Sequence, residues 1–104
     1  MNNNSIIQGT NPEHSYTLPI SGDMVDKVRV IYHQQDGVKI KKTESDAEWD
    51  GNTLKVKLSQ ADTFKLNHRW PVKIQLRVKT KLGKALRCDV GTKSVSECLD
   101  REVL

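Results

Sequence analysis

Val72-Lys-Ile-Gln-Leu-Arg-Val-Lys79 is the most regular stretch of the chain, and it decides the fold class. Apolar side chains occupy every second position, and Lys, Gln or Arg fill the positions between them. Successive side chains of a β-strand point to opposite faces, so this pattern predicts a strand with one face in a core and the other in water.

Two β-hairpins are expected before this strand. Each has two segments separated by residues that tolerate positive φ, the usual requirement of a tight hairpin turn. The first hairpin joins residues 27–34 to 38–41 around Asp36-Gly37. The second joins residues 43–49 to 53–58 around Asp50-Gly51-Asn52.

The alternation breaks after Leu58. Ser59 and Asp62 have side chains that cap short helices, which predicts a helical turn that carries Phe64 and Leu66 to the core. Such a turn would link one sheet to the other.

Further strands are expected over residues 5–8, 14–18 and 85–90. In the last of these, Leu86, Cys88 and Val90 share one face. We therefore expect Cys88 to be a small core residue and not a reactive thiol.

Residues 91–104 have weaker patterning, with Val95, Leu99 and Val103 spaced by four. This spacing is compatible with a final strand, with a short amphipathic helix, or with an arm that orders only against a partner.

The chain as a whole predicts one all-β domain over residues 1–104. Its length is close to the commonest domain size. About seven short strands, each bounded by Gly, Pro, Asn or Asp, are typical of an antiparallel sandwich or barrel. With few aromatic residues, the core is expected to rest on Val, Ile and Leu. Its aromatic supports would be Tyr16, Tyr32, Trp49, Phe64 and Trp70.

Several classes of protein are disfavoured by the composition. The longest apolar runs are two or three residues, against the roughly 20 that cross a bilayer. The start, Met1-Asn-Asn-Asn4, has neither the basic nor the apolar region of a secretory signal. Without an export signal, Cys88 and Cys98 are expected to be reduced thiols.

We found no catalytic or metal-binding motif in the sequence. The stretch Asp46-Ala-Glu-Trp-Asp-Gly51 is similar to the first half of a calcium loop, but the closing twelfth position is Lys57, where a bidentate Glu is needed. Phosphate loops, nucleophile elbows and zincin helices do not occur. We therefore expect a protein that is not an enzyme and that uses no cofactor or metal.

The positive charge is concentrated in one tract. The formal net charge is +4, and no Asp or Glu lies between Asp62 and Asp89. Such a tract attracts phosphate backbones or an acidic protein surface, although solvated strand faces explain the same residues without a ligand. Exposed aromatic residues for base stacking are missing from the predicted outward positions. The candidate polyanion-binding residues are Lys55, Lys57, Lys73, Arg77 and Lys79.

The order of motifs resembles that of small prophage-encoded proteins similar to the N-terminal domain of phage baseplate upper proteins. The resemblance spans nearly the whole chain and is carried by Ile7-Gln-Gly-Thr10, Tyr16-Thr-Leu-Pro19, Val28-Arg-Val-Ile-Tyr32 with Gln34, Gly51-Asn-Thr-Leu-Lys-Val-Lys-Leu58, Ser59-Gln60 with Asp62-Thr63, and Val72-Lys-Ile-Gln-Leu-Arg-Val78. It implies an immunoglobulin-like β-sandwich that assembles with itself or with other phage structural proteins. It also implies a location in the bacterial cytoplasm during assembly and then in the virion.

Two functions from different classes follow. The first is a structural or adaptor protein of tail or baseplate assembly, whose partners contact strand edges and the chain ends at residues 1–8 and 91–104. The alternative is nucleic-acid or polyanion binding through a Lys/Arg-rich sheet face. A carbohydrate-binding module carries less weight, because Trp49 and Trp70 are expected to close the ends of the core.

Overall fold

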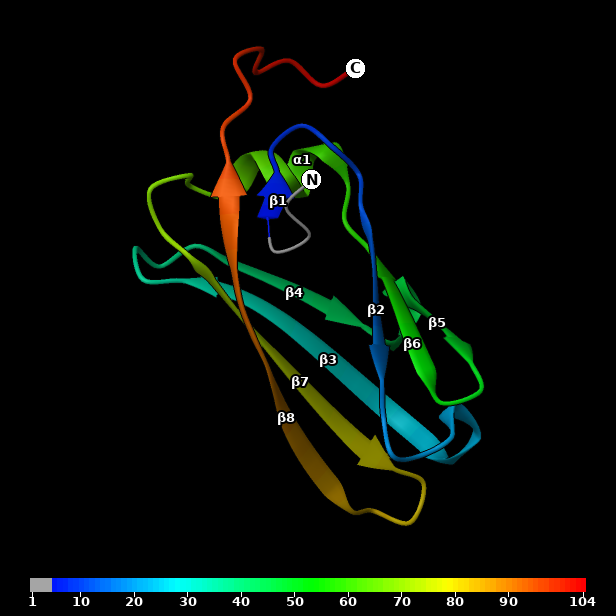
Figure 1. Ribbon diagram of the computed structural model, residues 1–104. Helices are drawn as coiled ribbons and strands as arrows, with labels where there is room; N and C mark the ends of the chain where they lie inside the picture. Colours follow the sequence, from blue (N-terminus) through cyan, green and yellow to red (C-terminus); the bar gives the residue numbers. More distant parts are fainter. Residues whose placement is uncertain (1–4) are drawn as a thin grey trace.

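The computed structural model describes residues 5–104, and its strands form two sheets around a common hydrophobic core (Figure 1). The larger sheet has the order β1-β8-β7-β3-β4, and the smaller sheet has the order β2-β6-β5. The described residues thus form eight strands where the sequence predicted about seven, and the all-β class is confirmed. The strands are β1 (Ser5–Ile7), β2 (Glu13–Thr17), β3 (Val25–Gln34), β4 (Lys39–Thr43), β5 (Ala47–Asp50), β6 (Thr53–Lys57), β7 (Val72–Thr80) and β8 (Ala85–Ser96).

The antiparallel pair β3 and β7 forms the centre of the larger sheet. Val30 lies opposite Leu76, and Tyr32 lies opposite Ile74. All four side chains are buried on the inner face, as the alternation predicted. Leu54 and Val56 of β6 are also buried and belong to the same core cluster, so the two sheets share one apolar interior.

Both predicted hairpins are present, but the first strand of the second begins at Ala47 and not at residue 43, because Glu44–Asp46 form a 3-10 turn. Strands β3 and β4 pair around a turn with Gly37 at φ 98°, and strands β5 and β6 pair around a turn with Gly51 at φ 61°. These positive φ values suit glycine, because it has no Cβ to clash with the backbone.

One buried amide fixes the loop that leads from the helix into β7. The Gln34 side chain is fully buried. Its Nε2 donates to the carbonyl oxygens of Asn67 at 2.7 Å and Trp70 at 2.9 Å, and its Oε1 accepts from the Asn67 N–H at 2.8 Å. Three backbone groups of the loop are therefore satisfied by one side chain.

The predicted helical turn is the helix α1 (Gln60–Lys65), and its capping is confirmed. The Ser59 hydroxyl accepts from the Asp62 N–H, and the Asp62 carboxylate accepts from the Ser59 N–H, each at 3.0 Å. Leu66 reaches the core, but the prediction for Phe64 is wrong, because its ring is only partly buried. The Arg101 guanidinium lies 5.1 Å from the centre of that ring, outside the core.

Trp70 also departs from its predicted core position. Its side chain is 37% exposed, because the loop is held through backbone atoms and leaves the indole at the surface. Trp49 is half-buried and packs against the core, close to Gly22. A Cβ on Gly22 would lie 2.5 Å from Trp49 Cγ, so this contact requires glycine.

The prediction that β8 contributes a core face at Leu86, Cys88 and Val90 is wrong. Leu86 is only half-buried, Val90 is 37% exposed, and Cys88 is exposed. Cys88 does lie opposite the buried Leu76, so the inward face was identified correctly. The three strands of the smaller sheet do not extend over this part of the five-stranded sheet.

The C-terminal stretch begins as a strand. Residues 91–96 continue β8, where Ser94–Ser96 pair in parallel with β1, and Val95 is buried. Beyond Ser96 the chain forms no helix, and Leu99 and Val103 are exposed. Residues 1–8 were also expected to contact partners, and Met1–Asn4 of this segment lie outside the described residues.

Buried Gln8 ties this C-terminal stretch to the body of the molecule. Its Nε2 donates to the Leu66 carbonyl at 2.6 Å. Its Oε1 accepts from the Cys98 N–H at 3.1 Å and from Arg101 Nη1 at 2.6 Å. Within residues 5–104, no helix has the length and apolar character needed to cross a membrane.

Replacing Gln34 with Leu should destabilise the fold, because the N–H of Asn67 and two loop carbonyls lose their buried partner. We expect a loss of about 2–3 kcal/mol in the free energy of unfolding, measured by urea denaturation. The same change at the exposed neighbour, Gln35→Leu, should alter the free energy of unfolding by less than about 0.5 kcal/mol. Equal effects at the two positions would show that the loop does not depend on the Gln34 amide.

Candidate functional site

The outer face of the five-stranded sheet is strongly basic. We call this surface the basic face and define it by the outward positions of β3, β4, β7 and β8 that pair across the sheet. Among these outward positions in residues 5–104, the one acidic residue is Asp89, whose carboxylate lies 3.5 Å from Arg87. The cations of the basic face are Lys27, Arg29, Lys39, Lys41, Lys73, Arg77, Lys79 and Arg87.

Like charges lie directly opposite one another on this face. Arg77 of β7 is opposite both Arg29 of β3 and Arg87 of β8, and Lys27 is opposite Lys79. Directly opposed like charges destabilise a sheet, so the arrangement is not explained by stability. A hollow of about 220 Å³ has Lys27, Arg29, Arg77 and Lys79 in its lining, and Arg29 forms a 3.0 Å ion pair with Glu44 outside this lining.

The structure divides the five candidate polyanion-binding residues between two faces. Lys73, Arg77 and Lys79 all lie on the basic face. Lys55 and Lys57 lie on β6 of the smaller sheet, where carboxylates surround them. The Lys55 Nζ is 3.8 Å from an Asp50 carboxylate oxygen, and the Lys57 Nζ is 4.0 Å from one of Glu13. These two lysines therefore do not extend the basic face.

A second unusual surface lies between β2 of the smaller sheet and β8 of the larger sheet, whose residues line a common hollow. In residues 5–104, β2 pairs only with β6, and β8 pairs with β1 only through Ser94–Ser96. The segment Ala85–Val90 of β8 thus has β7 on one edge and no described strand on the other. We call this region between β2 and residues 85–93 of β8 the open side.

Two adjacent hollows follow the open side. One of about 240 Å³ is lined by Pro19 and Ile20 after β2 and by Leu86 and Cys88 of β8. The other, of about 230 Å³, lies between Tyr16 and Val90. The linings of the two hollows also include Arg87 and Lys93 and contain no carboxylate. The first hollow is lined mainly by apolar side chains, whereas the second also has Ser15 and Thr92 in its lining.

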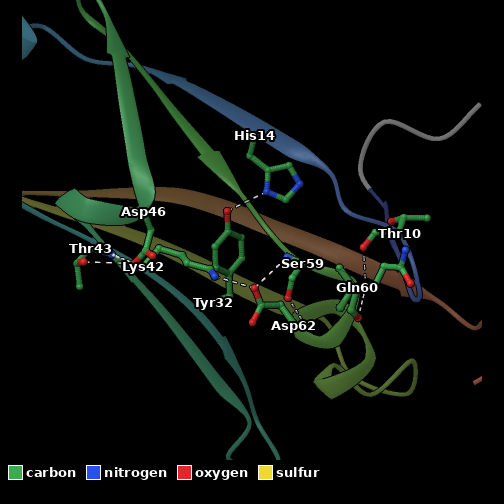
Figure 2. Close-up of polar contacts among 10 residues, drawn as sticks. Thr10, His14, Tyr32, Lys42, Thr43, Asp46, Ser59, Gln60 and Asp62 are labelled. Atoms are coloured by element: carbon green, nitrogen blue, oxygen red, sulfur yellow. Dashed lines mark hydrogen bonds and ion pairs between the residues drawn. The ribbon is translucent and has the colours of Figure 1, made fainter. Parts of the chain in front are cut away.

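A polar cluster inside the molecule connects the two sheets (Figure 2). The Tyr32 hydroxyl of β3 is 2.8 Å from His14 Nδ1 and 3.0 Å from the Tyr16 hydroxyl, both on β2. Lys42 of β4 forms a 2.7 Å ion pair with Asp62 of α1, and both side chains are largely buried. These polar groups bond to one another and to the helix cap, which is the arrangement of a structural network.

The surroundings shift the pKa values within this network. Burial acts to raise the pKa of Asp62, but the hydrogen bonds and charge of Lys42 and the bonds from Ser59 outweigh it, so the pKa lies below its ordinary value. Burial and the nearby positive charge of Lys93 lower the pKa of His14, which favours the neutral imidazole. Burial strongly raises the pKa of the Tyr32 hydroxyl.

The acidic stretch that is similar to a calcium loop is dispersed by the fold. Asp46 accepts from the Thr43 N–H at 2.9 Å in a short 3-10 turn, Glu44–Asp46, whereas Glu48 and Asp50 lie along β5. Within residues 5–104, no group of three or more His, Cys, Asp or Glu side chains is arranged to hold a metal ion.

Replacing Asp62 with Asn should weaken the fold by about 2 kcal/mol at pH 7, because Lys42 loses its charged partner. Since the folded-state pKa of Asp62 is depressed, its carboxylate stabilises the fold above the unfolded-state pKa of about 4, and this contribution disappears as pH falls through the folded-state pKa. Urea denaturation of both proteins between pH 7 and pH 3 should show the difference shrinking with acid. A difference that stays constant or grows toward pH 3 would contradict this role of the ion pair.

Comparison with known proteins gave no relative from which a site could be transferred. No protein-family model, curated protein sequence or solved structure matches this chain. The candidate surfaces, the basic face and the open side, therefore rest on the geometry of the chain itself.

Proposed function

We propose that this chain is a non-enzymatic binding module, a structural or adaptor protein that contacts an acidic partner protein through the larger sheet. The observation that carries the proposal is the position of the open side at the border of the basic face. Arg87 belongs to the basic face and also lines one of the apolar hollows. A partner with apolar and acidic groups can therefore contact both surfaces at once.

The exposure of apolar side chains on the open side supports a protein partner. Val90 is 37% exposed and Leu86 half-exposed, although Val78, the partner of Leu86 in β7, is buried. Apolar surface that is bordered by polar residues is typical of contact sites in soluble proteins. The polar cluster of His14, Tyr16 and Tyr32 is directed inward, and we assign it to the stability of the fold and not to chemistry.

The phage origin and the immunoglobulin-like arrangement of the strands belong to the same proposal. They are supported by the sequence motifs that resemble the N-terminal domain of baseplate upper proteins. In this setting, the partner is another structural protein of the tail or baseplate, or a second copy of the chain. The protein would then be located in the cytoplasm during assembly and afterwards in the virion.

A direct test is to mix the purified chain with each protein encoded beside its gene and to measure the mass by light scattering after size-exclusion chromatography. We expect at least one complex of defined stoichiometry, and the chain alone is examined across a concentration series as the control. The proposal fails if the chain remains a monomer at every concentration and forms no complex with any of these proteins.

Polyanion binding is a second candidate function, and the hollow with four cations favours it. Lys27, Arg29, Arg77 and Lys79 line the same hollow on the basic face, and of these four Arg29 has a carboxylate partner, Glu44 at 3.0 Å. Phosphate groups of a nucleic acid would neutralise such a cluster and release counterions. The charge-balanced surroundings of Lys55 and Lys57 provide a matched control on the smaller sheet.

The double substitution Lys73→Gln/Arg77→Gln should lower the affinity for double-stranded DNA about tenfold at 50 mM salt and should reduce the slope of log affinity against log salt by about 2. The control Lys55→Gln/Lys57→Gln removes the same charge and should change the affinity less than about twofold. Fluorescence anisotropy with a labelled 20-base-pair duplex measures both. Equal losses, or no binding by the unsubstituted protein at low salt, would remove this candidate.

A further inference from the structure

The edge of β8 over residues 85–90 is the starting point, because no described strand pairs with its backbone on the side away from β7. Residues Ala85–Asp89 pair with β7, the register shifts at Val90, which has no partner residue in β7, and the parallel partner β1 begins only at Ser94. Every second residue of this edge presents its N–H and C=O groups away from β7. Such an edge is a template for another extended chain.

The dimensions of the open side suit one extended strand. Six residues from Ala85 to Val90 span about 20 Å at 3.3 Å per residue. A strand added at the edge would lie about 4.8 Å from β8 and would continue the five-stranded sheet. Its inward side chains would then enter the two hollows along the open side, which are lined by Leu76, Val78, Leu86, Cys88 and Val90 among others.

The two faces of an added strand meet different chemistry. Inward side chains contact the lining of the two hollows, which is apolar between Ile20 and Leu86 and includes Lys93 at its other end. Outward side chains stand beside the basic face, where Arg87 and Arg77 form a row of like charges and where Asp89 lies 3.5 Å from Arg87. An alternation of apolar and acidic residues satisfies both faces, and the acidic residues would relieve the repulsion in that row.

We propose that the open edge of β8 binds, by strand addition, an extended segment of a partner protein in which apolar and acidic residues alternate. The inference rests on the proposed function, since it names the class of segment that the acidic partner presents. The apolar side chains enter the hollows between β2 and β8, and the acidic side chains face Arg87 and the adjacent basic face.

Charge argues against a second copy of this chain as the occupant. Pairing β8 with β8 of another copy would join two basic faces edge to edge, with Arg87 and Arg77 of both copies on the same side of the joined sheet. Asp89 of each copy offsets one charge, but the cations of two joined basic faces outnumber these carboxylates and repel one another. A foreign acidic strand carries no such penalty.

The test uses the intact chain and a synthetic nine-residue peptide, Thr-Glu-Val-Glu-Val-Glu-Val-Glu-Thr, with blocked ends and a fluorescent label. A peptide with Lys in place of every Glu is the charge control. We expect fluorescence anisotropy to show at least tenfold tighter binding of the acidic peptide. In NMR spectra, the largest amide shifts should fall on residues 85–90 of β8.

Two matched protein variants locate the binding. Arg87→Glu changes the border of the open side, where the Arg87 side chain is 65% exposed, and should weaken binding of the acidic peptide at least tenfold. Lys41→Glu makes the same charge change on β4, at the opposite edge of the sheet, and should weaken it less than about twofold. Melting curves confirm that both variants fold.

Several results would overturn the inference. These are the absence of peptide binding, equal binding of the Lys peptide, equal losses for both variants, or amide shifts spread over the basic face and not concentrated on β8. Concentration-dependent shifts of residues 85–90 without peptide would assign the edge to a second copy. If a neighbouring gene product forms a complex that Arg87→Glu does not weaken, the proposed function stands and strand addition at β8 is wrong.

Discussion

The structure depends on a difference in width, because a sheet of three strands faces a sheet of five. A core can be complete only where both layers are present. Over β3 and β7 this condition holds, and Val28, Val30 and Tyr32 are fully buried. Along the first half of β8 the cover ends, so side chains with the correct inward direction remain in contact with solvent. The open side is a direct consequence of this difference.

Polar groups hold the two layers together where apolar packing is thin. The Lys42–Asp62 ion pair attaches α1 to β4, and the Tyr32 hydroxyl attaches β3 to β2 through His14 and Tyr16. Buried polar groups are costly unless each has a partner, and in residues 5–104 no buried side-chain nitrogen or oxygen lacks one. Satisfied networks of this kind make the relative position of two sheets specific.

The sequence predicted the elements that local chemistry determines. Alternation identified β7, glycine-containing turns identified both hairpins, and Ser59 with Asp62 identified the cap of α1. Alternation tells which side chains share a face, but it does not tell whether another layer covers that face. For this reason the prediction of a core position for Cys88 is wrong. It also does not tell which sheet a strand joins, so Lys55 and Lys57 were grouped with Lys73 although the fold places them on different sheets. The parallel contact of β1 with β8 joins residues about 90 positions apart, and no local signal marks it.

The claim on which the account depends is that the edge of β8 is open in the free molecule. Amide hydrogen exchange, followed by NMR in a monomeric sample, tests it most directly, because edge N–H groups exchange quickly and paired ones slowly. The account predicts that every second amide within residues 85–90 exchanges far faster than the amides of β7 between Lys73 and Lys79. If all amides of residues 85–90 are protected as strongly as those of β7, the edge is covered and the open side is not a binding surface.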